Sequence, residues 1–227
     1  MGQKDNKIIK MKKNITNLII LDASSSMTHK ADEVRGGLKD LLKDIKKDMK
    51  ENKDARMITI VCQFSSSNNF KVLLNTSERK EIKPTKLSQL YSPSGWTALY
   101  DGIGEGFNLV GDKEDGVFVN ILTDGEENSS QEFTQKAIKK MLDDAKESKW
   151  GVTFMGTTES AIQNAINLGI TRGNTYQFAD TKAGVDLSNN AKFLSRKLYT
   201  TTVMRSASVD DIQVNNLMSD IENDIEK

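Results

Sequence analysis

The chain has 227 residues, of which 37% are hydrophobic and 28% are charged, which is enough apolar material for the core of one large domain. Its 32 Lys and Arg residues balance its 32 Asp and Glu residues, so the formal net charge is zero. Because there is no excess of positive charge, and no RNA-binding or helix-turn-helix pattern, we do not expect the protein to bind nucleic acid.

Short apolar runs alternate along the chain with amphipathic segments. The apolar runs are typical of buried strands, whereas apolar residues three and four positions apart are typical of helices. In chain order, strands are expected at residues 17–21, 57–64, 70–74, 117–122, 151–155 and 175–178, and helices at 31–49, 98–109, 133–146, 160–168 and 187–199. Because a short, turn-rich break separates the second strand from the third, we expect these two to pair as a hairpin.

Strands that alternate with helices predict an α/β fold. We expect a Rossmann-like, three-layer α/β/α sandwich, whose central sheet is mostly parallel with one antiparallel edge strand. Residues 14–204 would form this domain, after an N-terminal extension at residues 1–13. Residues 205–227 lose the apolar periodicity and gain Asp and Glu, so they are predicted to form an acidic tail or a short helix.

The cysteine content and the lengths of the apolar runs bear on the compartment. Cys62 is the single cysteine, so the chain cannot form an internal disulfide, which suits a reducing compartment. The N-terminal residues lack an apolar run of signal-peptide length, and the longest apolar stretch, residues 18–21, is far too short to cross a bilayer. We therefore expect a cytoplasmic protein, of a bacterial cell or a phage-infected host cell, without membrane contact.

Three polar loops lie where the predicted sheet would bind a ligand, at the carboxyl ends of its strands. Asp22, Ser24 and Ser26 come directly after the first strand, and their alternate positions in an extended loop allow them to converge. Thr97 lies just before a helix, and Asp124 follows the most apolar strand. All five side chains offer oxygen and none offers nitrogen or sulfur, which suits a hard cation such as Mg²⁺ or Mn²⁺.

These loops resemble the three metal-binding loops of the von Willebrand factor A domain. The matching segments are residues 22–26 (Asp-x-Ser-x-Ser), residues 95–102 (Gly-Trp-Thr-Ala-Leu-Tyr-Asp-Gly) and residues 122–126 (Leu-Thr-Asp-Gly-Glu). Their order, spacing and strand context are similar to those of the family, and the resemblance covers roughly residues 14–200. It implies a metal-ion-dependent adhesion site.

The resemblance also implies a role for each residue. The hydroxyls of Ser24 and Ser26 would bind the metal directly, and that of Thr97 directly or through water. The carboxylates of Asp22 and Asp124 would act mostly through bound water and set the geometry. Mg²⁺ is the expected cation, with Mn²⁺ and Ca²⁺ as alternatives. Because few carboxylates would bind it directly, the cation would stay electrophilic and favour an Asp or Glu from a protein partner.

Each loop also has an ordinary explanation when it is taken alone. Asp and Ser after a strand often cap the next helix, and Asp-Gly is a common turn. Three side chains are candidates for a partner-binding rim: Trp96, where many family members have a small residue; His29, the only histidine; and Glu126. For these three, packing or simple exposure to solvent is the alternative.

The leading functional hypothesis is a non-enzymatic, metal-dependent module that binds a partner's acidic side chain. A second hypothesis is a structural or assembly protein of a phage or plasmid, because the chain is rich in Lys, Asn and Ile, as AT-rich genomes encode. It would form a homo-oligomer through the same site, which would receive a carboxylate of the acidic tail from a neighbouring copy. The tail offers Asp210, Asp211, Asp220, Glu222 and Asp224.

A third hypothesis is a metal-dependent hydrolase. Phosphatases of the haloacid dehalogenase type also carry an Asp after the first strand of a Rossmann-like sheet, but they need a second carboxylate where this chain has Ser24. The sequence has no plausible Ser-His-Asp set, no phosphate-binding glycine loop and no zinc-ligand cluster. We therefore do not expect an enzyme.

Overall fold

The computed structural model describes residues 13–111, 114–124, 126–206, 208, 212 and 214–219. Six strands form one sheet in the order β3-β2-β1-β4-β5-β6. They are β1 (Lys13–Asp22), β2 (Ala55–Phe64), β3 (Lys71–Thr76), β4 (Gly116–Leu122), β5 (Gly151–Gly156) and β6 (Thr175–Gln177). Neighbouring strands are parallel except for the antiparallel pair of β2 and β3 at one edge, which confirms the predicted mixed sheet.

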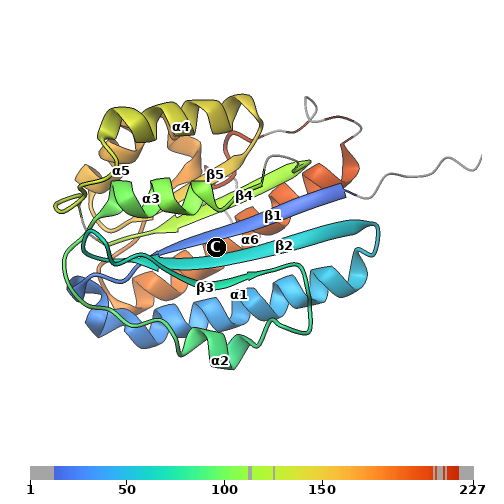
Figure 1. Ribbon diagram of the computed structural model, residues 1–227, viewed down its shortest axis with the longest axis horizontal. Coiled ribbons are helices and arrows are strands. Elements are labelled where there is room, and N and C mark those ends of the chain that lie inside the picture. Colours follow the sequence, from blue (N-terminus) through green and yellow to red (C-terminus); the bar gives the residue numbers. More distant parts are fainter. Residues whose placement is uncertain are drawn as a thin grey trace, which may run out of the picture.

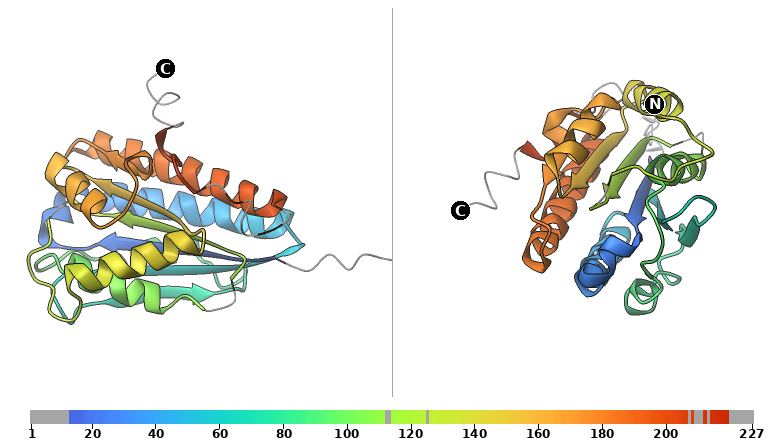
Figure 2. Two further views of the ribbon diagram at one scale, coloured as in Figure 1. Left: turned by 90° about the horizontal axis from the view of Figure 1, so that it is seen from above. Right: turned by 90° about the vertical axis from the view of Figure 1, so that its left-hand side faces the viewer.

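Helices cover both faces of the sheet, as Figures 1 and 2 show. On one face lie α1 (Ala31–Glu51) and α6 (Lys182–Arg205), with the short α2 (Pro84–Ser88) beside α1. The other face carries α3 (Leu99–Asn108), α4 (Gln135–Glu147) and α5 (Glu159–Asn167). Two 3₁₀ helices, η1 (Ser25–Lys30) and η2 (Arg172–Asn174), lie in connections. The predicted three-layer α/β/α architecture is therefore confirmed.

The core lies between these layers because successive side chains of a strand point to opposite faces of the sheet. In β1, Leu18 and Ile20 belong to the apolar cluster under α3, α4 and α5, whereas Ile19 and Leu21 belong to the cluster under α1. All four side chains are at most 1% exposed. Both faces of the central strand are buried, which explains why its sequence is a continuous apolar run.

Several elements extend beyond their predicted bounds. β1 begins at Lys13 because it pairs along its length with β2, although its first residues are partly polar. α6 begins at Lys182, where the side chain of Thr181 caps the helix by accepting a hydrogen bond from the Gly184 N–H at 3.1 Å. The α2 helix was missed because it forms little more than one turn. Within the described ranges, none of the helices combines the length and apolar character that a bilayer span requires.

The described part of the segment predicted as an acidic tail or short helix packs against the domain. Ile212, Val214 and Leu217 are buried in an apolar cluster with β1, β2, β4 and α6, and Met218 is buried in the cluster under α1. The five acidic residues suggested for self-association lie outside the described residues.

Candidate functional site

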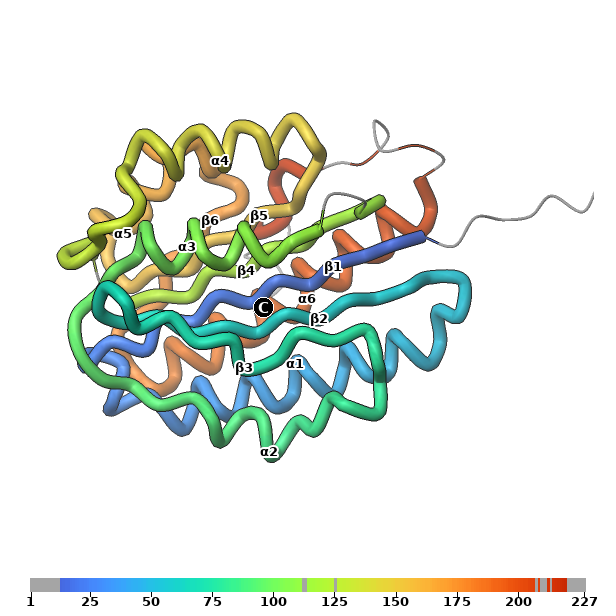
Figure 3. Tube along the Cα trace, viewed as in Figure 1, coloured from blue at the N-terminus to red at the C-terminus, as the bar shows by residue number. Residues whose placement is uncertain are grey.

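The three polar loops meet at the end of the sheet where its parallel strands have their carboxyl ends (Figure 3). β1 and β4 are parallel neighbours, with Leu21 opposite Leu122, so the loops that carry Asp22 and Asp124 begin side by side. Backbone hydrogen bonds attach the third loop to the first: the Ser94 N–H donates to the Ala23 carbonyl at 2.7 Å and the Ser25 N–H donates to the Gly95 carbonyl at 2.9 Å. Segments far apart in the sequence thus form one polar surface.

Asp22 is buried at the base of this surface, with 0% of its area exposed. Its Oδ1 accepts a hydrogen bond from the Ser24 N–H at 2.7 Å, and its Oδ2 accepts one from the Thr123 hydroxyl at 2.6 Å. Burial raises the pKa of Asp22 to about 6, although the hydrogen bonds from Thr123 and Ser24 oppose the rise. Both carboxylate oxygens are therefore held by the protein, and Asp22 determines the shape of the first loop.

Three oxygen-bearing side chains, those of Ser24, Ser26 and Asp124, are linked in a row by hydrogen bonds. The Ser24 and Ser26 Oγ atoms are 3.0 Å apart, and the Ser26 hydroxyl donates to Asp124 Oδ1 at 2.7 Å. Adjacent ligands of an octahedral Mg²⁺ ion lie about 2.9 Å apart, given Mg–O distances of about 2.0–2.1 Å. The spacing of these oxygens and their hard-donor chemistry thus fit such an ion, although in the described part of the chain no three His, Cys, Asp or Glu side chains converge.

Thr97 lines the same cavity, of about 470 Å³, as Ser24 and Ser26. Its backbone is held from both sides by Asn128: the Thr97 N–H donates to Asn128 Oδ1 and the Asn128 N–H donates to the Thr97 carbonyl, each at 3.0 Å. Nearby, Gly95 has a φ of +80°, and a Cβ there would lie 2.4 Å from the Ser66 hydroxyl. The second loop is therefore rigidly placed, and Asn128 is a positioning residue that the motif comparison did not identify.

Lys30 is a second residue that the sequence did not indicate. Its side chain is fully buried, its Nζ lies 2.5 Å from Asp124 Oδ2, and it also forms an ion pair with Asp180. The ammonium group thus neutralises much of the charge that Asp124 brings to the site. Only the folded chain reveals this contact, because Asp180 follows Lys30 by 150 positions.

The three predicted rim residues have different surroundings. Trp96 lines the cavity beside Thr97 and is 70% exposed. His29 and Glu126 are exposed but do not line that cavity, and His29 Nε2 lies 3.8 Å from Asp180 Oδ1. The structure therefore brings Trp96 to the predicted metal ligands and leaves the other two at a distance from the cavity wall.

The fold is similar to that of several solved structures. The pilus adhesin SpaC from Lactobacillus rhamnosus GG aligns with a TM-score of 0.60 and 17% identity over 80% of this chain and 30% of its own. Proximal thread matrix protein 1 from the mussel byssus aligns with a TM-score of 0.57 and 16% identity over 80% of this chain and 45% of its own. The chain thus spans less than half the length of either protein.

A third structure is matched over almost its whole length. The vWF domain of the type V pili tip protein Mfa5 from Porphyromonas gingivalis aligns with a TM-score of 0.63 and 9% identity over 88% of this chain and 99% of its own. At such identities the likeness concerns the fold alone. No curated protein matches the chain.

The family model of the von Willebrand factor type A domain matches residues 18–190. This range contains all three polar loops and five of the six strands in full, with the second half of β1. The chain therefore belongs to the von Willebrand factor type A domain family.

Proposed function

We propose that the protein is a non-catalytic binding module whose site holds a divalent cation, Mg²⁺ in the first place, and uses it to capture an acidic side chain of a protein partner. The observation that carries this proposal is the row of oxygen atoms from Ser24, Ser26 and Asp124, spaced at 3.0 and 2.7 Å, of which the two serines line an open cavity together with Thr97. Membership of the family and the fold shared with pilus adhesins support it.

In this proposal, some residues of the site bind the cation and others position its ligands. The hydroxyls of Ser24, Ser26 and Thr97 would bind the cation, while Asp22 and Asp124 would orient bound water and balance the charge. A bound cation would supply an electrophilic position for a carboxylate, because neutral hydroxyls reduce its charge less than carboxylates do. Since Lys30 already pairs with Asp124, the site would gain still more from an external carboxylate.

Calorimetric titration with Mg²⁺ and Mn²⁺ tests the metal site. Wild type should bind one ion, and Ser26→Ala should weaken binding at least tenfold, because it removes a ligand and the hydrogen bond to Asp124. Ser25→Ala is the matched control, since this neighbouring hydroxyl lies outside the row of hydrogen-bonded oxygens. Equal affinities of the two variants would contradict the assignment.

Capture from a native lysate tests the partner. Immobilised wild type should retain a protein in Mg²⁺ and release it in EDTA, and Ser26→Ala should retain none. A partner that stays bound in EDTA would show that recognition does not depend on the metal.

A further inference from the structure

The metal-site end of the molecule exposes an apolar side chain that the described residues leave largely uncovered. Among the described residues, Trp96 has the most exposed large hydrophobic side chain, with 70% of its area accessible. Tryptophan combines a large apolar surface with one N–H donor, and it is enriched at the centres of protein interfaces. The indole lines the same cavity as Ser24, Ser26 and Thr97, so a partner that approaches the site also meets it.

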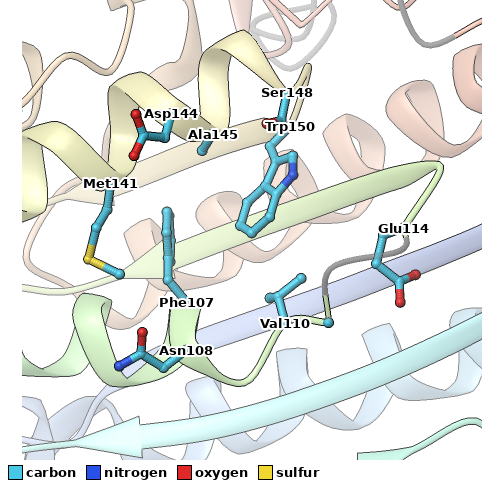
Figure 4. Close-up of a pocket in the computed structure, with 10 residues that line it drawn as sticks. Phe107, Asn108, Val110, Glu114, Met141, Asp144, Ala145, Ser148 and Trp150 are labelled. Atoms are coloured by element: carbon cyan, nitrogen blue, oxygen red, sulfur yellow. The ribbon is translucent and has the colours of Figure 1, made fainter.

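The opposite end of the molecule has an open groove, lined by both apolar and polar side chains. It lies where α3 and α4 end, and its volume of about 620 Å³ is within the range of about 300–1,000 Å³ that is usual for ligand pockets. Figure 4 shows Phe107, Met141 and Trp150 around this space, with the carboxylate of Asp144 beside Met141. The rings of Phe107 and Trp150 pack at a centroid distance of 5.4 Å, so one wall of the groove is aromatic.

These two surfaces have complementary chemistry. A cation-loaded site with an adjacent indole would need a carboxylate next to a recess that offers apolar side chains, and the groove offers Phe107, Met141 and Trp150 with Asp144 beside them. The partner of Asp144 is Lys140, at 2.8 Å, and the two side chains are 60% and 77% exposed. Exposed ion pairs of this kind contribute little, so this carboxylate is free to exchange Lys140 for a metal ion.

The surfaces also lie at opposite ends of the parallel strands. Trp150 comes immediately before the first residue of β5, whereas Ser24 and Asp124 follow the last residues of β1 and β4. The three strands are parallel to one another, so the groove is at their amino end and the metal site is at their carboxyl end. One molecule cannot bring its own two surfaces together, but two molecules arranged head to tail can.

We propose that the occupant of the groove is a second copy of this chain: Trp96 of one copy enters the groove of the next, whose Asp144 supplies the acidic side chain to the metal site. This inference rests on the proposed function and names its partner. The contact joins two different surfaces, so it does not close into a twofold dimer and builds a chain or a ring of copies.

Sedimentation velocity at high protein concentration, in Mg²⁺ and then in EDTA, tests this arrangement. The mass of wild type should grow with concentration in Mg²⁺ and fall to that of one chain in EDTA. Trp96→Ser removes the indole beside the metal site and leaves the groove intact, whereas Asp144→Asn removes the carboxylate of the groove and leaves the metal site intact. Each variant alone should therefore stay a monomer. An equimolar mixture of the two should form a species of two chains and no larger one, since it offers one intact contact.

Two matched variants serve as controls and should assemble as wild type does. Asp143→Asn removes the neighbouring exposed carboxylate of α4, which pairs with Lys139 in the same way, and Leu90→Ser removes another exposed apolar side chain. Calorimetry on the same samples separates the two proposals. Wild type that binds Mg²⁺ but stays a monomer would overturn head-to-tail docking and leave the metal site standing. The same conclusion would hold if another molecule were found to occupy the groove. Wild type that binds no Mg²⁺ would overturn the metal site and the docking with it.

Discussion

The α3–α5 face of the sheet rests on one continuous apolar cluster, whereas the α1–α6 face rests on two clusters with polar side chains between them. On four adjacent strands, the residue between the two clusters is polar and buried. These residues are Asn17, Thr59, Asn120 and Thr153. The helix α6, which covers this face, contributes two buried charged side chains to the same polar layer. They are Lys192 and Arg196, each at most 1% exposed.

This polar layer costs the α1–α6 face free energy. Within the described residues, Asn17 Oδ1, Thr59 Oγ1 and Lys192 Nζ have no hydrogen-bond partner, and a buried polar group without a partner costs free energy. Arg196 Nη2 pairs with Asp44 and Asp48 of α1, whereas its Nε and Nη1 also lack a partner within the described residues. The comparison teaches that the α3–α5 face has an unbroken apolar core, whereas buried polar side chains interrupt the core of the α1–α6 face.

The largest effect is expected from a cavity in the continuous cluster. Phe154, in β5, is 1% exposed on the α3–α5 face. Phe154→Ala should lower the free energy of unfolding by about 3–5 kcal/mol, because it removes buried apolar surface and leaves a cavity. Urea denaturation measures the change, with Val72→Ala at a 46% exposed position as the control. A loss below about 1 kcal/mol would show that the continuous cluster is not closely packed at this position.

The next effect is expected at Lys30, which lies on the α1–α6 face beside the proposed metal site. Lys30→Met should lower the stability of the metal-free protein by about 3 kcal/mol, because it leaves Asp124 buried without its cation. Mg²⁺ should then raise the melting temperature more in the variant than in wild type, since the ion faces no competing ammonium group. Thermal unfolding with and without Mg²⁺ measures both effects. A smaller Mg²⁺ shift in the variant would mean that Lys30 assists the metal instead of competing with it.

Lys192 should make the stability of the protein depend on pH. Burial lowers the pKa of Lys192 from 10.5 to about 8, so above pH 8 the unfolded chain holds more protons than the folded one. Lys192 should therefore raise stability with pH in this window, by about 2 kcal/mol from pH 7.5 to pH 9.5, and Cys62, whose pKa is raised by burial, should offset part of that rise. Urea denaturation across this range should show the rise in wild type and in Lys197→Met, an exposed control on the same helix. The rise should be absent in Lys192→Met, and a parallel rise there would assign it to another group.

The smallest effect is expected within the polar layer of the sheet. Thr59→Val keeps the shape of the side chain and removes a buried hydroxyl that has no partner among the described residues. Stability should rise by up to about 1 kcal/mol, because the penalty for that hydroxyl disappears. The same change at Thr153 should instead lower stability, since its hydroxyl accepts from Asn120 at 2.9 Å and donates to the Val119 carbonyl at 3.1 Å. Equal changes in stability at the two positions would show that a hydroxyl without a partner and a hydrogen-bonded hydroxyl do not differ in their effect here.

The fold could be predicted from the sequence because its elements follow local rules. Apolar runs such as residues 117–122 identify buried strands, and apolar residues at helical spacing identify α1 and α4. The polar layer escaped notice because Asn17 and Thr59 lie inside or beside apolar runs. A strand pattern does not show which neighbours face each side chain across the sheet.

The sequence by itself determined the α/β fold, the family and the grouping of Asp22, Ser24, Ser26, Thr97 and Asp124 on one edge, because parallel strands carry their following loops to the same end. Only the tertiary structure decided the remaining contacts. Three features join residues that are distant in the chain: the ion pair between Lys30 and Asp124, the hydrogen bond from Thr97 to Asn128, and the groove at the end opposite the proposed metal site. Such contacts depend on how helices pack across the sheet, and no local pattern in the sequence encodes that packing.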